Sequence, residues 1–335
     1  MRQFDYHSPN TIDEVITLLE QDGDGATRPL AGGTDLLTLM KGNIASPTRL
    51  LDIKRLGDLP RGIEETQKGL SLGALTTLTE IEAHPLVQQQ YPALAEAAAL
   101  AATPQLRNMA TLGGNLLQRP RCWYFRDEQF HCWLKGGDEC QARDGMNQQH
   151  ALLDLSPCVA VHPSDLASAL VALDAQLRVR GPNGERVLPL QDFFAVPEPQ
   201  RRTENVLGGD ELVLSVHLSP LFDGTRSTYL KAMDRKVWAF ALVGVAARIR
   251  INSEGRIEDA RIVLSGVAPV PWRVETAEQA LIGMEVSETL FDRVADTALA
   301  DAQPLDHNGY KVPLAKSLIR RALATMTADQ LAGGS

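Results

Sequence analysis

The residues of this sequence best suited to redox chemistry are its four cysteines, Cys122, Cys132, Cys140 and Cys158. Four thiolates are the usual ligand set of a cubane iron–sulfur cluster. Their spacing matches no zinc finger and contains no CxxC pair, so structural zinc, two disulfides and unlinked thiols stay open as alternatives. Disulfides would in addition need an oxidising compartment.

Two glycine pairs have the pattern of anion-binding turns, Gly32-Gly33 within Ala31–Asp35 and Gly113-Gly114 within Thr111–Asn115. A Gly-Gly turn before a helix lets successive backbone N–H groups converge on an anion, and the helix N-terminus adds positive potential. One such turn is equally compatible with a tight turn that binds nothing, whereas two of the same type suit a diphosphate. Neither matches GxGxxG or GxxxxGK[ST], so the pattern indicates a dinucleotide held by another fold.

The elements that must position these residues are both helices and strands. Apolar residues at helical spacing predict helices over 11–21, 36–40, 78–88, 92–102, 275–282, 288–300 and 314–327. Apolar or alternating runs predict strands at 28–31, 50–53, 70–74, 176–180, 211–218, 239–251 and 260–268. Residues 119–157 show little periodicity, which is unusual in a compact domain unless something organises the segment. The mixture indicates an α+β protein with a domain boundary near 220–228.

Composition limits the classes of partner. The chain is 44% hydrophobic and 22% charged and has a formal net charge of −9, with its basic residues dispersed, so we expect no nucleic-acid binding. No apolar run approaches the ~18 residues of a membrane span. The first residues lack the apolar run of an export signal. We therefore expect a cytoplasmic location, or a periplasmic one if a partner subunit carries the export signal.

The order of four motifs gives the sequence a family resemblance. Ala31–Leu36, Leu72–Leu78, Arg107–Leu116 and Pro163–Leu166 together resemble the FAD-binding medium subunit of the xanthine dehydrogenase family of molybdenum hydroxylases. The resemblance continues through Tyr229–Lys231 and Leu264–Ala268 to Arg320–Leu323, so it covers nearly the whole chain. The cysteine segment is most similar to that of bacterial molybdenum aldehyde oxidoreductases and more distantly to that of 4-hydroxybenzoyl-CoA reductases. Both kinds carry an additional [4Fe–4S] cluster on this subunit.

The resemblance implies a fold with two domains. The first would be an FAD-binding domain of the vanillyl-alcohol-oxidase type over 1–222, with lobes at about 1–60 and 61–222 and an iron–sulfur loop at 119–160. The second would be a C-terminal α+β domain over 229–330, similar to that of the carbon monoxide dehydrogenase flavoprotein.

The resemblance also implies site residues. The FAD diphosphate would be wrapped by the loop formed by Leu30, Ala31, Gly32, Gly33, Thr34, Asp35 and Leu36. Thr111, Gly114 and Asn115 would hold the other side of the dinucleotide, Asp165 would bond the ribityl chain or its surroundings, and Lys231 would approach the flavin. The four cysteines would ligate the cluster. Where the family often has an acidic residue, Arg235–Phe240 departs from the pattern and leaves Trp238 and Phe240 as candidates to stack on the flavin ring.

The function that the resemblance implies is electron transfer. A large molybdenum-cofactor subunit would oxidise an aldehyde, a small subunit with two [2Fe–2S] clusters would relay the electrons, and the flavin of this chain would pass them to an external acceptor. No catalytic acid or base is needed in this chain. The alternatives are a 4-hydroxybenzoyl-CoA reductase-like subunit that passes electrons from ferredoxin toward molybdenum, a free-standing FAD oxidase, and a colourless zinc-stabilised binding module.

Overall fold

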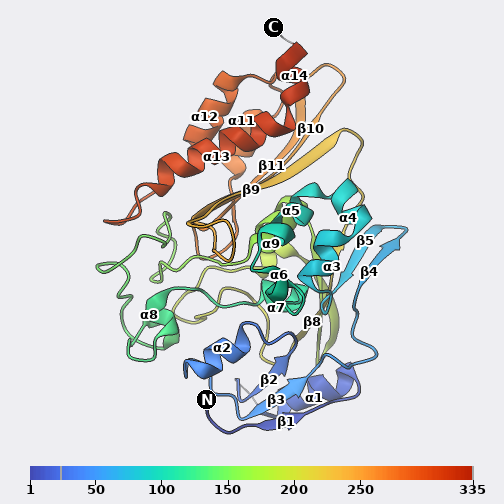
Figure 1. Cartoon of the computed structure of the whole chain (residues 1–335), viewed down its shortest axis with the longest axis vertical. Helices are drawn as coiled ribbons and strands as arrows, with labels where there is room; N and C mark the ends of the chain where they lie inside the picture. The colour runs from blue at the N-terminus through green and yellow to red at the C-terminus, as the bar shows by residue number, and fades with distance from the viewer. Residues whose placement is uncertain (23–24, 334–335) are drawn as a thin grey trace.

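The computed structural model describes residues 1–22 and 25–333, and these residues form three β-sheets along the long axis of the molecule (Figure 1). The N-terminal sheet (blue) lies at one end, and the C-terminal sheet with its helices (orange and red) lies at the other. A five-stranded sheet lies between them. Two of the three sheets are antiparallel and carry their helices mainly in separate stretches of the chain, in keeping with the predicted α+β class.

The N-terminal sheet is parallel and has the strand order β1-β3-β2. Its strands are β1 (Asp5–His7), β2 (Thr27–Leu30) and β3 (Arg49–Asp52). Helix α1 (Ile12–Asp22) packs beside it through a buried apolar stripe of Val15, Ile16 and Leu19. Helix α2 (Leu36–Lys41) follows β2 across the first glycine pair. The helices predicted over 11–21 and 36–40 are therefore confirmed.

The central sheet is antiparallel, with the order β4-β5-β8-β6-β7. Its strands are β4 (Ile63–Thr66), β5 (Gly69–Gly73), β6 (Gln176–Gly181), β7 (Gly184–Pro189) and β8 (Leu212–Leu218). The helices that share its apolar core are α3 (Leu78–Ala83), α4 (Pro85–Gln90), α5 (Pro92–Leu100), α7 (Leu112–Leu116), α9 (Asp165–Ala172) and α10 (Leu190–Phe193). The short helix α6 (Pro104–Arg107) lies on the surface between α5 and α7.

Two helices of this domain differ from the sequence prediction. The single helix expected over 78–88 is two helices, because His84 precedes Pro85 and adopts an extended conformation that ends α3. Helix α9 was not predicted, because all eight of its residues are buried and it has no polar face to create a helical period.

The C-terminal domain is an antiparallel sheet in the order β12-β11-β10-β9, covered on one side by helices. Its elements are β9 (Thr225–Ala232), β10 (Val243–Ile251), β11 (Ile257–Ser265), β12 (Trp272–Arg273), α11 (Glu275–Leu281), α12 (Glu288–Ala298), α13 (Lys311–Met326) and α14 (Ala328–Gly333). Since β9 begins at Thr225, the connection placed near 220–228 ends earlier than expected. The division of the chain at 222 stays a prediction.

The cysteine segment is largely irregular, as expected, and contains only α8 (Trp123–Arg126) and the 3₁₀ turn η1 (Trp133–Lys135) among the elements described there. In Figure 1 it stands at the left in green, beside α2 at its lower end and beside the start of α13 at its upper end. Within residues 1–22 and 25–333, no helix combines the length and the apolar composition needed to cross a membrane.

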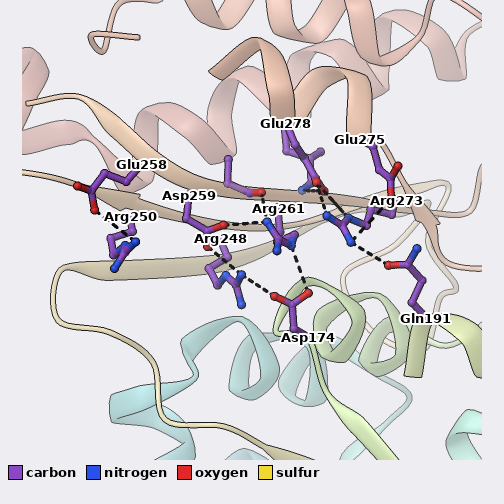
Figure 2. Close-up of polar contacts among 12 residues, drawn as sticks. Asp174, Gln191, Arg248, Arg250, Glu258, Asp259, Arg261, Arg273, Glu275 and Glu278 are labelled. Atoms are coloured by element: carbon purple, nitrogen blue, oxygen red, sulfur yellow. Dashed lines mark hydrogen bonds and ion pairs between the residues drawn. The ribbon is translucent and has the colours of Figure 1, made fainter. Parts of the chain in front are cut away.

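A network of arginines and carboxylates ties the C-terminal sheet to the central domain (Figure 2). Arg248 of β10 and Arg261 of β11 both donate to Asp174, in the turn between α9 and β6, at 2.7 and 3.2 Å. On β12, Arg273 donates to Gln191 of α10 at 3.0 Å and to Glu278 of α11 at 2.8 Å. The two domains are thus joined by directional polar contacts as well as by apolar packing.

Candidate cofactor site

The two glycine turns, distant in sequence, lie against each other. A Cβ atom added at Gly32 would clash with the carbonyl oxygen of Met109, just before the second turn. Gly33 has a φ of +71°, a conformation that favours glycine. Only glycines therefore fit where the first turn meets the second.

The first turn presents free backbone donors. Within the described part of the chain, the amides of Gly32, Gly33, Thr34 and Asp35 donate to no protein acceptor, while the Gly33 carbonyl accepts from Leu37 of α2 at 3.1 Å. Consecutive free amides at the start of a helix form the concave donor group that binds phosphate oxygens. This turn fits the diphosphate that the sequence predicts there.

The second turn uses its donors within the protein. The hydroxyl of Thr111 accepts from the Gly114 amide at 3.3 Å and caps α7. The side-chain oxygen of Asn115 accepts from the Ser164 hydroxyl at 2.5 Å. Because Ser164 is the N-cap of α9, this bond places the second turn beside Asp165. Gly114 is exposed.

Asp165 and Lys231, predicted from opposite halves of the chain, meet in a buried ion pair. Lys231 Nζ donates to Asp165 Oδ2 at 2.7 Å and to the Leu100 carbonyl at 3.0 Å. The Tyr229 hydroxyl donates to Asp165 Oδ1 at 2.6 Å. Burial and the neighbouring Asp165 charge raise the pKa of Tyr229 well above its usual value of 10.0, so the phenol stays a donor. The two side chains bond each other, and their contact with a cofactor stays a prediction.

A pocket between the central and C-terminal domains joins these residues to the cysteine segment. Its lining includes Asp165, Ser265, Phe240, Arg121, Cys122 and His150. Arg121 lies over the Phe240 ring at 5.0 Å from its centroid. Phe240 is therefore the aromatic candidate that borders the pocket, whereas Trp238 is 57% exposed and is not part of its wall.

The four cysteines gather in two adjoining apolar clusters and are free thiols. The Ala160 amide donates to Cys158 Sγ at 3.4 Å, and nearby backbone amides act to lower the pKa of each of the four thiols. Such amide donors stabilise thiolate sulfurs that ligate iron. The segment is thus organised around its sulfurs.

The thiols differ in acidity. Burial raises the pKa of Cys122 to about 12 and also raises the pKa of Cys132. A hydrogen bond from Cys158 lowers the pKa of Cys140 to about 6, and the same contact with burial raises the pKa of Cys158. Among the described residues, no three Cys, His, Asp or Glu side chains are placed to hold one metal ion.

Asp35 belongs to both parts of the site. Its carboxylate accepts from the Arg119 amide at 3.0 Å, from Arg126 at 2.8 Å and from Arg121. It therefore fastens the start of the cysteine segment to the first glycine turn. Arg119 and Arg121 are visible in the sequence only as a short basic cluster, and no pattern there names their partner.

His150 and Lys311 make further contacts at the end of the cysteine segment. His150 Nε2 lies 3.1 Å from Cys122 Sγ. Burial and the Lys311 charge lower the pKa of His150 to about 4. Lys311, at the start of α13, donates to the His150 carbonyl at 2.8 Å, and burial lowers the pKa of Lys311 to about 7. These contacts join the C-terminal domain to the cysteine segment.

Comparison with known protein families identifies the family to which this chain belongs. A family model described as the FAD binding domain in molybdopterin dehydrogenase matches residues 2–220, and one described as the CO dehydrogenase flavoprotein C-terminal domain matches residues 228–326. The chain belongs to the FAD-binding subunits of the molybdenum hydroxylase family.

Individual relatives of this family cover the whole chain. The aldehyde oxidoreductase FAD-binding subunit PaoB of Escherichia coli strain K12 is 40% identical over 98% of this chain and 100% of its own length. The carbon monoxide dehydrogenase medium chain of Hydrogenophaga pseudoflava is 31% identical over 96% of each chain. A solved structure of carbon monoxide dehydrogenase from the same organism superposes with a TM-score of 0.78 at 29% identity over 98% of each chain.

Membership of the molybdenum hydroxylase family confirms the resemblance at that level. This FAD-binding subunit is a flavoprotein component of an oxidoreductase, and the turn at Gly32–Asp35 fits the diphosphate of the cofactor. The family membership leaves no support for a colourless zinc-stabilised module.

Proposed function

We propose that this chain is the FAD and [4Fe–4S] electron-transfer subunit of a heterotrimeric molybdenum-dependent aldehyde oxidoreductase. The observation that carries the proposal is the gathering of four free thiols in two adjoining clusters, one of which, Cys122, lines the pocket that reaches Asp165. The relative named as an aldehyde oxidoreductase FAD-binding subunit, at 40% identity, supports the substrate class.

For FAD, we assign the diphosphate to the loop of Leu30, Ala31, Gly32, Gly33, Thr34, Asp35 and Leu36. The free amides of this loop support the assignment. Thr111 and Asn115 shape the second turn, and exposed Gly114 lets a ligand approach its backbone. Asp165 lines the pocket and is paired with Lys231 behind it. When bound, FAD supplies exchange between one-electron and two-electron transfer.

For the cluster, we assign Cys122, Cys132, Cys140 and Cys158 as the ligands. Iron requires thiolates. Burial raises the pKa of Cys122 and Cys132, and the contact with Cys140 together with burial raises that of Cys158, so the bound metal must hold these thiols deprotonated. Tyr124, Phe125 and Trp133 are each less than 10% exposed and keep water from the sulfurs. No proton transfer is assigned to any residue of this chain.

The partners we assign are a small subunit with two [2Fe–2S] clusters and a large subunit with the molybdenum cofactor, together with an external electron acceptor. Relatives named as medium chains support an enzyme of several chains. We also assign residues 1–222 to the FAD-binding domain and 229–330 to the C-terminal domain. The division agrees with the change of sheet between β8 and β9.

The test is a spectrum and a metal analysis of the chain purified without oxygen. We expect flavin bands over an iron–sulfur shoulder, with about four iron and four sulfide per chain. Replacing each cysteine in turn by serine should remove the iron and leave the flavin. Flavin without iron would overturn the cluster, and aldehyde oxidation by the isolated chain would favour a free-standing oxidase.

A further inference from the structure

One imidazole stands in contact with a proposed cluster ligand. His150 Nε2 lies 3.1 Å from Cys122 Sγ, and the His150 side chain belongs to a residue that is 3% exposed. Its other ring nitrogen, Nδ1, is buried and has no hydrogen-bond partner among the described residues. The contact with Cys122 is therefore the one polar contact that the described structure offers this ring.

His150 is held at its ring and at its backbone. Trp123 meets the ring edge to face, with 5.6 Å between centroids and planes 73° apart. At the backbone, the His150 carbonyl accepts from Lys311 Nζ at 2.8 Å and from Asn308 Nδ2 at 3.2 Å, and both residues are 0% exposed. The carbonyl bonds fix the backbone of His150, and the contact with Trp123 packs its ring in the position beside Cys122.

The direction of the hydrogen bond follows from the chemistry of the two groups. A thiolate can only accept, and a neutral imidazole carries its single proton on one of its two nitrogens. A proton on Nδ1 would face no acceptor and would leave two lone pairs, on Nε2 and on sulfur, facing each other. The proton therefore belongs on Nε2, which donates to the sulfur.

We propose that His150 is a positioning residue whose Nε2–H donates to the Cys122 thiolate and raises the reduction potential of the cluster. The inference rests on the cluster proposed above. A donor to a ligating sulfur draws negative charge away from the iron, so it stabilises the reduced cluster more than the oxidised one. Of the four cysteines, Cys122 is the one with a histidine contact within the described residues.

The test compares three variants in the assembled enzyme, by redox titration of the cluster followed with electron paramagnetic resonance. His150→Leu removes the donor, and His150→Gln keeps one at similar reach. His131→Leu is the control, because His131 precedes ligand Cys132, is exposed and makes no side-chain hydrogen bond among the described residues. At a fixed ambient potential, we expect the ratio of reduced to oxidised cluster to fall about threefold or more in His150→Leu, and less in His150→Gln.

A normal iron content with an unchanged potential in His150→Leu would overturn the proposal and leave the cluster itself standing. Wild-type protein without iron would instead overturn the proposed function. If His150→Leu fails to keep its iron, a second measurement uses the wild-type protein labelled with ¹⁵N-histidine. Hyperfine spectroscopy of its reduced cluster should show weak coupling to a histidine nitrogen, and this coupling should disappear in His150→Gln. No coupling, or the strong coupling of a directly ligating nitrogen, would contradict a hydrogen bond.

Discussion

The ammonium group of Lys231 and the carboxylate of Asp165 form an ion pair at 2.7 Å in which the side chains are 1% and 5% exposed. Lys231 belongs to β9 of the C-terminal sheet and Asp165 begins α9 of the central domain. The pair therefore holds the two domains together next to the pocket that Asp165 lines. Removing one member leaves the other as an uncompensated buried charge.

Lys231→Met should lower the free energy of unfolding by about 3–5 kcal/mol, because it strands the Asp165 carboxylate. In the double variant with Asp165→Asn the charge is gone and Tyr229 keeps an acceptor, so much of the loss should return. Urea unfolding, with flavin content measured in the folded protein, checks both. Equal stability of the single and double variants would show that the pair is not held as described.

Gly244→Ala should displace Tyr229 from Asp165. A Cβ at residue 244 would lie 2.5 Å from the Tyr229 hydroxyl oxygen and 3.1 Å from Ser265 Cβ, with no flexible end to give way. Tyr229→Phe removes only the hydrogen bond and should cost about 1–3 kcal/mol, since Asp165 loses a donor. We expect Gly244→Ala to lower the melting temperature more than Tyr229→Phe does. The reverse order would mean that the sheet absorbs the methyl group.

Gly32→Ala should reduce the flavin content of the purified protein by roughly tenfold or more, because the two glycine turns must separate to admit the methyl group. Gly57→Ala is the matched control, since a Cβ at Gly57 meets no atom within 4 Å. Flavin released by denaturation and measured per chain gives the answer. Full occupancy in Gly32→Ala would place the diphosphate elsewhere.

Asp35→Asn should loosen the cysteine segment. Asp35, with a side chain 15% exposed, receives two arginines and one amide of that segment, and charged hydrogen bonds of this kind contribute about 1.5–3 kcal/mol each. We expect limited proteolysis within 119–160 to become at least about tenfold faster. Asp13→Asn is the control, because its pair with Arg180 leaves Asp13 79% exposed. Equal cleavage rates in the two variants would contradict the contact.

His162 should make the protein less stable in acid. Burial lowers the pKa of His162 to about 3, so the folded state stays neutral while an unfolded chain takes up a proton below about 6.5. Stability should therefore fall as the pH drops from about 6.5 toward 3, by about 1.4 kcal/mol for each pH unit. The melting temperature of wild type should decline more steeply between pH 7 and pH 5 than that of His162→Gln. Parallel profiles would show that His162 is protonated in the folded protein.

The sequence predicts features that depend on one short segment, and it does not predict contacts between segments that are distant in sequence. Helices α1 and α12 were predicted because one face is buried and the rest is polar, whereas α9, buried on every side, has no such period. The two glycine turns and the four cysteines were found by residue type and spacing. The partners of Asp35 and Asp165 were not, because each contact joins residues whose positions depend on the assembled domains.

The bond between Asn115 and Ser164 has a consequence for how such a protein evolves. Asn115 lies in α7 and Ser164 caps α9, and their side chains meet at 2.5 Å. The two ends of the segment that carries all four cysteines therefore lie side by side. A segment whose two ends lie side by side can be lengthened, shortened or lost by insertion and deletion without moving the sheets on either side. We expect this fold to gain or discard its sulfur-bearing segment as a module while the flavin domain persists.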